Sequence, residues 1–234
     1  MIPLHDDNPT TITPLITIVL IVINVFVFLW QVSLPAMEQE RVVFALGSIP
    51  AVLFGEAVLA TDLALVPPEL SVITSMFLHG GWLHLIGNML YLWIFGNNVE
   101  DAMGHVRFVV FYLLCGIAAA LAQAWQDPTS TIPMIGASGA IGGVLGAYLI
   151  LHPTARILVL VPLGFLFPVI RVPAVVVLGI WFLMQFLESA ARPAGAGGVA
   201  YWAHIGGFIA GAVLIFVFKR RQVVLLDRRA GPWG

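Results

Sequence analysis

The chain has 234 residues, of which 60% are hydrophobic and 9% charged, and its formal net charge is −2. A soluble domain carries about 25% charged residues, so this chain has too few to cover a surface that faces water. The composition therefore predicts a protein embedded in lipid, and the sequence contains no basic stripe that would indicate a nucleic-acid partner.

The N-terminus differs from a secretory signal peptide, which begins with a basic segment and ends at a small-residue cleavage site. Its first eleven residues contain Asp6 and Asp7 but no Lys or Arg. We therefore expect the first apolar run to be retained as a membrane span. The single cysteine, Cys115, lies inside another apolar run, where a packing role is expected.

Six segments approach the length of about 20 mostly apolar residues that a helix needs to cross a bilayer. The stretch from Val32 to about Leu70 carries several charges, so we expect a long external first loop with interfacial or re-entrant helix pieces. Leu158–Ile170 is apolar but interrupted by proline and glycine, and we interpret it as a connection rather than a seventh span. The sequence predicts a single-domain, all-α membrane protein with a six-helix bundle and a short, central, glycine-rich fourth helix. The expected spans are 12–31, 82–97, 106–125, 138–151, 172–187 and 201–218.

Basic residues are unevenly distributed over the two sides that six spans would create. Eight lie on the side of the termini and two on the other, so the positive-inside rule predicts that both termini are cytoplasmic. The short termini favour a prokaryotic plasma membrane. The eight residues are Arg107, Arg156, Arg171, Lys219, Arg220, Arg221, Arg228 and Arg229, and the two are Arg41 and Arg192.

Ser138 opens the fourth expected span within Gly136-Ala137-Ser138-Gly139. Further glycines follow one helical turn apart, and such small residues let neighbouring helices approach closely, so Ser138 could be a packing residue. Alternatively, the flanking glycines clear space around a reactive hydroxyl. Backbone N–H groups at the start of the helix would then be free to bind an oxyanion. This segment taken alone leaves both interpretations open.

His204 lies near the start of the last expected span, three residues before Gly207 and on nearly the same helix face. Gly207 and Gly211 form a GxxxG pair, which allows close approach of another helix. The glycine-rich helix that begins at Ser138 is the natural partner. Histidine is the usual general base for a serine hydroxyl.

His84 and Asn88 are four residues apart in the second expected span and therefore share one helix face. Both can donate hydrogen bonds to a developing oxyanion, although a hydrogen bond between helices is the structural alternative. His79 precedes this span, where it could brace the loop or take part in chemistry. Since spans two, four and six would all begin outside, we expect His84, Ser138 and His204 to converge near the outer face.

These segments resemble the rhomboid family of intramembrane serine proteases. That family has a histidine and an asparagine four apart in the second span, GxSG opening the fourth and AHxxG in the sixth. The resemblance covers essentially the whole chain, although the family's first-loop tryptophan-arginine pair is not evident near Arg41. It implies proteolysis of transmembrane proteins within the bilayer, without a metal or another cofactor.

The resemblance also assigns roles to residues. Ser138 and His204 would form a catalytic dyad without the carboxylate of a triad, and His84, Asn88 and the Ser138 N–H would form the oxyanion hole. Glu100 aligns with a glutamate of the family's second loop and would brace that loop near Arg107. Structural support is expected from His79, Gly136, Gly139, Glu100, Gly207 and Gly211.

Other classes of protein fit the sequence less well. An inactive rhomboid-like binding or quality-control factor would not need to retain the serine, the histidines and the asparagine together. A transporter usually carries acidic residues in its span cores, and an aspartyl protease needs paired aspartates; the expected spans supply neither. A zinc site of His79, His84 and His204 would lack the HExxH pattern and leave Asn88 and Ser138 unexplained.

Overall fold

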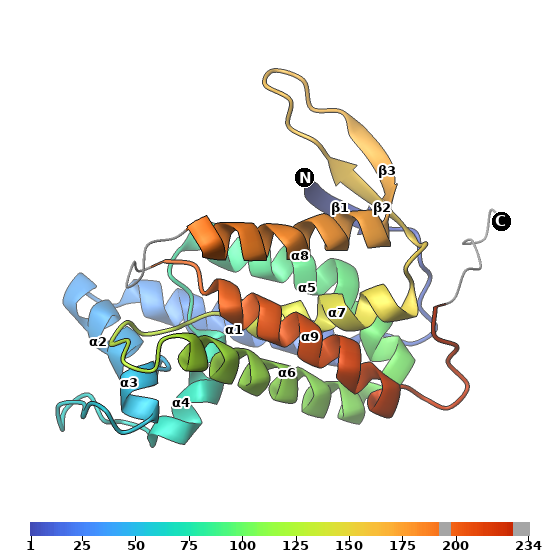
Figure 1. Ribbon diagram of the computed structural model, residues 1–234. Coiled ribbons are helices and arrows are strands. Elements are labelled where there is room, and N and C mark those ends of the chain that lie inside the picture. Colours follow the sequence, from blue (N-terminus) through green and yellow to red (C-terminus); the bar gives the residue numbers. More distant parts are fainter. Residues whose placement is uncertain (192–197, 227–234) are drawn as a thin grey trace.

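The computed structural model describes residues 1–191 and 198–226, and every structural statement below concerns these ranges. The chain is mostly helical, and its long helices run side by side along one direction (Figure 1). Within the described ranges, four helices are long and apolar enough to cross a membrane: α1 Leu15–Ser33, α6 His105–Gln126, α8 Ala174–Ala191 and α9 Tyr201–Phe218. The protein is therefore a helical membrane protein.

The remaining two expected spans are less regular. α5, Trp82–Met103, passes the same test only together with the bent segment Pro68–Phe77, from which it turns by 85°. It continues beyond the expected end at residue 97 to Gly104, whose φ of +83° ends the helix. α7, Ser138–Leu151, has the expected bounds but only 14 residues. The six-span arrangement therefore stays a prediction, and Arg192, Arg228 and Arg229 lie outside the described residues.

The long first connection folds into short helices, as expected. These lie at the end of the bundle opposite the sheet (Figure 1). Ser48 and Met134 exchange backbone hydrogen bonds, and the Gly136 N–H donates to the Ser75 carbonyl at 2.8 Å. The connection is thereby tied to the segment that leads into α7. The short helices are α2 Ala36–Leu46, α3 Pro50–Leu53, α4 Pro68–Thr74 and the 3-10 turn η1 Ser75–Phe77.

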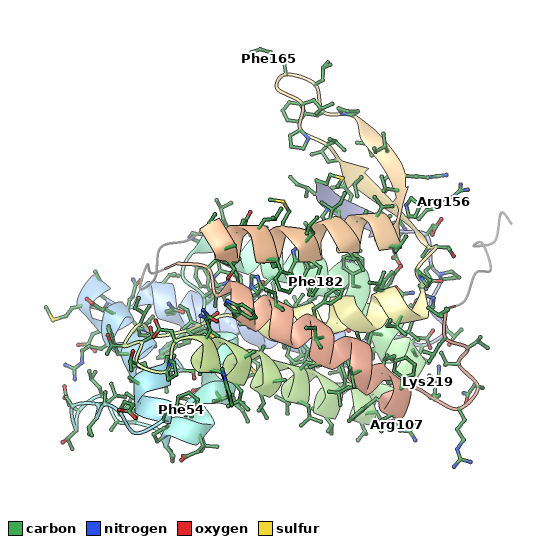
Figure 2. The ribbon with its side chains drawn as sticks, in the orientation of Figure 1. Phe54, Arg107, Arg156, Phe165, Phe182 and Lys219 are labelled. Atoms are coloured by element: carbon green, nitrogen blue, oxygen red, sulfur yellow. The ribbon has the colours of Figure 1, made fainter. Side chains whose placement is uncertain are left out.

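The chain is mostly α-helical, as expected, but one region forms a three-stranded antiparallel sheet that the sequence analysis did not predict. β1 Ile2–Asp6 pairs with β2 Arg156–Leu160, which pairs in turn with β3 Val169–Pro173. Prolines in the β2–β3 connection oppose helix formation, and the branched apolar residues of both strands favour extended backbone. Leu158–Ile170 is thus a hairpin rather than a span, and its tip at Phe165 projects away from the helices (Figure 2).

α7 lies at the centre of the bundle, and nearly all of its residues are buried. Its contact with α9 depends on glycine: a Cβ added at Gly207 would lie 1.9 Å from the Gly139 carbonyl oxygen, and one at Gly211 would lie 1.9 Å from that of Gly143. Any side chain there would force the helices apart. The predicted GxxxG packing is therefore present, and it brings the start of α7 against the start of α9.

Candidate active site

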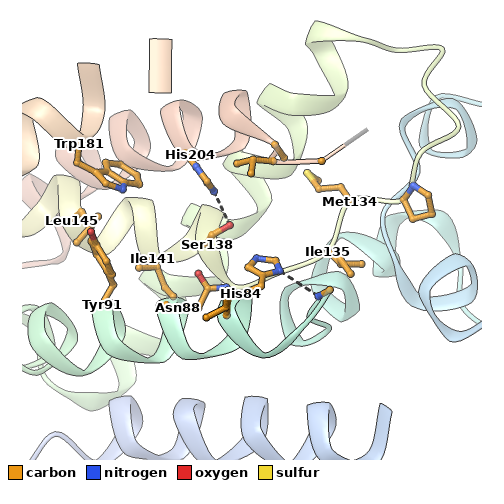
Figure 3. Close-up of a pocket in the computed structure, with 17 residues that line it drawn as sticks. His84, Asn88, Tyr91, Met134, Ile135, Ser138, Ile141, Leu145, Trp181 and His204 are labelled. Carbon is orange, nitrogen blue, oxygen red and sulfur yellow. Dashed lines mark hydrogen bonds between the residues drawn. The ribbon is translucent and has the colours of Figure 1, made fainter. Parts of the chain in front are cut away.

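Ser138 and His204 lie opposite each other on α7 and α9. The Ser138 Oγ and the His204 Nε2 are 2.8 Å apart, within hydrogen-bond distance (Figure 3). Both side chains are half-buried. Because the glycine contacts fix the two helices against each other, the hydroxyl and the imidazole need little rearrangement to exchange a proton.

The other ring nitrogen of His204 contacts a residue that the sequence analysis missed. Gln185 of α8 is buried, and its Oε1 lies 2.7 Å from the His204 Nδ1. Its Nε2 donates to the Trp181 carbonyl at 3.0 Å, and the Trp181 ring packs on the imidazole with centroids 5.7 Å apart. Gln185 is a strongly polar residue within the apolar span expected at 172–187, the same signal that singled out His204.

His84 faces the start of α7 from α5. Its Nδ1 accepts a hydrogen bond from the Gly80 N–H at 3.3 Å, so the proton of the neutral ring belongs on Nε2. Gly136 makes room for this ring: its φ is +122°, and a Cβ there would lie 2.7 Å from the His84 Nε2. The segment before Ser138 can therefore pass directly against an imidazole N–H donor.

Asn88 lies one helical turn after His84 on α5 and is buried. Its Nδ2 has no hydrogen-bond partner among the described residues. A buried donor without a partner is uncommon and lowers the stability of the folded protein, so the presence of one here calls for an explanation. An oxygen atom of a bound substrate would supply the missing acceptor.

His84, Asn88, Ser138 and His204 all line one cavity of about 700 Å³ (Figure 3). The rest of its wall is largely apolar, including Leu83, Met134, Ile135, Ile141, Leu145 and Trp181. α7 begins at Ser138 without a side-chain cap, and the first amides of a helix have no acceptor within it. The cavity thus combines a hydroxyl, a base and several hydrogen-bond donors in an apolar surrounding.

His79 is placed behind His84 rather than beside Ser138. It is fully buried, and its ring centroid is 5.0 Å from that of His84. Its backbone N–H and carbonyl both hydrogen-bond the side chain of Gln31 on α1. This favours the bracing role over the chemical one. In the described part of the chain, no group of three His, Cys, Asp or Glu side chains is arranged to hold a metal ion.

The Glu100 carboxylate is buried, and its hydrogen-bond partners lie at the start of α1 and at His105. It accepts from the Ile16 N–H at 2.9 Å, the Thr17 N–H at 2.8 Å and the Thr17 hydroxyl at 2.7 Å, and it also contacts the His105 Nδ1. Arg107 donates to the Lys219 carbonyl. The amides that open α1 need acceptors, and the buried Glu100 carboxylate lies close enough to supply them.

Several known proteins are similar in sequence to this chain. Rhomboid protein 1, mitochondrial, of Saccharomyces cerevisiae is 34% identical to this chain over 180 residues, which cover 72% of the chain and 48% of the yeast protein. The rhomboid protease GluP of Bacillus subtilis is 35% identical over 143 residues, which cover 61% of the chain and 25% of that protein. The putative rhomboid protease YdcA of the same species is 30% identical over 128 residues, covering 53% and 64%.

The chain thus spans about half the length of the yeast relative and less than two thirds of the two bacterial ones. The family model described as Rhomboid domain matches residues 69–221, which include α5, α6, α7, α8 and α9 and every residue around the cavity that carries a polar role above. Since this match covers more than half of the sequence, the chain belongs to the rhomboid family.

Proposed function

We propose that this protein is an intramembrane serine endopeptidase in which Ser138 is the nucleophile and His204 the general base. The observation that carries the proposal is the 2.8 Å contact between the Ser138 Oγ and the His204 Nε2 at the wall of a mostly apolar cavity. The names of two bacterial relatives, a rhomboid protease and a putative rhomboid protease, support the same reaction class.

The mechanism follows from the donors and acceptors around the cavity. Ser138 attacks the scissile carbonyl carbon while the His204 Nε2 takes the hydroxyl proton and later returns it to the leaving amine. The oxyanion that forms accepts hydrogen bonds from the Asn88 Nδ2, the His84 Nε2 and the Ser138 N–H. A water molecule, activated by His204, then hydrolyses the acyl-enzyme and regenerates the serine.

The substrate class we propose is a transmembrane segment of another protein, reached from the surrounding bilayer. A helix in lipid satisfies its own backbone hydrogen bonds, so a substrate must unwind locally before its carbonyl can reach Ser138. Residues that weaken a helix should therefore lie near the cleaved bond. The apolar wall of the cavity suits the side chains that such a segment carries.

We further propose the six-span arrangement, with α5 and the short, glycine-rich α7 as the second and fourth spans of one domain. Arg107, Arg156 and Lys219 lie at the end of the bundle that carries the sheet (Figure 2). The positive-inside rule then places this end, with both termini, in the cytoplasm and the cavity near the outer face. The membrane we propose is a prokaryotic plasma membrane, although the yeast relative is mitochondrial by name.

The direct test is labelling of the purified protein with a fluorophosphonate or isocoumarin probe, together with cleavage of a single-span reporter. We expect the wild type to be labelled and to cleave, and Ser138→Ala to do neither while remaining folded and inserted. His204→Ala should lose cleavage by a factor of at least about 10⁴, because serine and base act as one unit. Undiminished cleavage by either variant would disprove the dyad, and a wild type that neither labels nor cleaves would indicate an inactive rhomboid-like factor.

A further inference from the structure

We infer that Gln185 is a positioning residue of the site, which holds the His204 imidazole in the tautomer and orientation that Ser138 needs. This inference rests on the proposed function. It adds a third, uncharged member to what the family resemblance describes as a dyad. Its basis is the 2.7 Å contact between the Gln185 Oε1 and the His204 Nδ1, on the side of the ring that faces away from Ser138.

The direction of this contact follows from the atoms around Gln185. The Trp181 carbonyl oxygen can only accept a hydrogen bond, so the Gln185 amide must present its NH₂ group there, at 3.0 Å. This fixes the orientation of the amide and leaves Oε1, an acceptor, facing His204. The His204 Nδ1 must therefore carry the proton in the neutral ring.

The tautomer has a direct consequence for Ser138. With its proton on Nδ1, the neutral imidazole has a lone pair on Nε2, which is the atom 2.8 Å from the Ser138 hydroxyl. The opposite tautomer would present an N–H to the hydroxyl and could not take its proton. An acceptor at Nδ1 also stabilises the imidazolium that forms during attack, which is the role of the aspartate in a Ser-His-Asp triad.

Gln185 is well suited to hold the ring because its own side chain is held. Trp181 and Gln185 are four residues apart and share the face of α8 that packs on α9. Phe182 of α8 stacks on Phe208 of α9 with centroids 4.5 Å apart, and Figure 2 shows Phe182 between these helices. The amide is buried, its NH₂ is bonded within its own helix, and the helix is anchored beside the imidazole.

No carboxylate contacts the His204 ring within the described part of the chain. The titratable groups near it are Tyr201 on α9 itself, with ring centroids 6.4 Å apart, and His84 across the cavity on α5. The group of α8 that contacts the His204 Nδ1 is the neutral amide of Gln185. Its exchange for methionine therefore removes the hydrogen bond to the imidazole without adding or removing a charge.

The test uses two substitutions of nearly equal shape. Gln185→Met removes the acceptor, whereas Gln185→Glu keeps an acceptor oxygen in the same place. The matched control is Gln123→Met, because the Gln123 Oε1 accepts from the Ala203 N–H at 3.3 Å and so binds α9 one residue before His204 without touching the ring. For each, kcat and KM for the single-span reporter are measured from low to high pH, with thermal unfolding as a folding check.

We expect Gln185→Met to lower kcat by about tenfold to a hundredfold with little change in KM, as for weakened general-base catalysis. The acidic limb of its plot of kcat against pH should move to lower pH, because the His204 imidazolium has lost its hydrogen-bond acceptor. Gln185→Glu should keep kcat within about tenfold of wild type, with an acidic limb no lower than that of wild type. Gln123→Met should leave kcat and the limb unchanged.

Two results would overturn the inference. One is wild-type kcat and an unmoved acidic limb in Gln185→Met. The other is an equal loss in Gln185→Met and Gln123→Met without movement of the limb, which would make Gln185 a packing residue. Both leave the dyad intact, because the dyad fails only if Ser138→Ala or His204→Ala still cleaves the reporter.

Discussion

The two ends of α7 lie in opposite kinds of surroundings. At its first residue, Ser138, the helix faces a cavity of about 700 Å³ whose wall includes the unpaired Asn88 Nδ2. At its other end, the buried Tyr148 hydroxyl donates to the carboxylate of Asp6 on β1 at 2.7 Å. We call these the site end, with Ser138, His84, Asn88 and His204, and the sheet end, with β1, β2, β3, Tyr148 and the carboxylates of Asp6, Glu100 and Asp101.

The difference indicates how stability and activity are distributed along the molecule. At the sheet end, carboxylates accept hydrogen bonds from amides, hydroxyls and an arginine, so removing one leaves buried donors without partners. At the site end, donors remain available for a substrate, and their removal costs the folded protein little. Substitutions at the sheet end should therefore lower stability, and those at the site end should lower the rate of cleavage.

The largest effect on stability is expected for Glu100→Ala. The change leaves the Ile16 N–H, the Thr17 N–H and the Thr17 hydroxyl without their acceptor. Each unsatisfied buried donor costs about 1–3 kcal/mol, so the free energy of unfolding should fall by at least about 3 kcal/mol. Denaturant unfolding in detergent measures this loss. Glu100→Gln, which keeps one acceptor oxygen, should lose less, and a stable Glu100→Ala that does not cleave would contradict the assignment of Glu100 to stability.

Asn88→Ala should show the reverse behaviour. Removing one donor to an oxyanion lowers kcat by about 10²–10³-fold, whereas the folded protein loses no hydrogen bond of the Asn88 Nδ2. The matched control lies ten residues further along α5, where the Asn98 Nδ2 donates to the Asn8 carbonyl at 2.9 Å. Asn98→Ala should cost about 1 kcal/mol of stability and leave kcat unchanged. Reporter cleavage and denaturant unfolding are measured for both variants. A loss of kcat in Asn98→Ala rather than in Asn88→Ala would contradict this assignment.

Much of the site end could be predicted from the sequence because its signals are local. Ser138 and His204 stand in apolar segments beside glycines, and the glycine spacing alone pairs their helices. Gln185 was missed although it is a polar residue in an apolar span. Its contact with His204 depends on the packing of α8 against α9, and the spacing of residues within either helix does not predict that packing.

The sheet end could not be predicted in the same way because its contacts join distant parts of the chain. β1 pairs with a strand about 150 residues later, and Asp6 reaches Tyr148 across 142 positions. Leu158–Ile170 was expected to be a connection, but its strand pairing was not predicted, although a hairpin suits branched apolar residues between prolines. Glu100 was expected to have a structural role, yet its partners on α1 could not be named without the packing of α1 against α5.

The next prediction concerns Tyr148 and Asp6. Tyr148→Phe removes the donor to a buried carboxylate and should lower the free energy of unfolding by about 1–3 kcal/mol without changing kcat. Gly211→Ala is the contrasting change, at the contact of α9 with α7. Its Cβ would lie 1.9 Å from the Gly143 carbonyl oxygen, so the change should impair folding and activity together. Loss of kcat in folded Tyr148→Phe would show that the sheet end also controls the site.

The same pair predicts a pH dependence of stability. Burial raises the pKa of Asp6 from its ordinary value of 3.8, an effect that the Tyr148 hydrogen bond opposes in part. The folded protein therefore binds a proton more tightly than the unfolded chain, so this contribution to stability is greatest at low pH and is lost as pH rises through the raised pKa. Asp6→Asn cannot titrate. The unfolding temperature of Asp6→Asn should therefore rise relative to that of wild type as the pH increases from about 4. Identical dependence of the two unfolding temperatures on pH would contradict this prediction.

The smallest effect is expected for two ion pairs, one in the long first connection and one at the sheet end. Arg41 contacts Asp62 at 2.9 Å in the connection that precedes the cavity, but the two side chains are 45% and 64% exposed. Such pairs contribute about 0–1 kcal/mol, so Arg41→Ala should leave the unfolding temperature almost unchanged. Arg220 contacts Asp101 at the same distance with exposures of 34% and 13%, and the Thr11 N–H and hydroxyl share that carboxylate. Arg220→Ala should therefore lower the unfolding temperature more than Arg41→Ala, and this difference should persist in high salt, which screens the exposed pair first. An equal loss in both variants would mean that neither the exposure of the pair nor the sharing of the Asp101 carboxylate decides how much these contacts stabilise the protein.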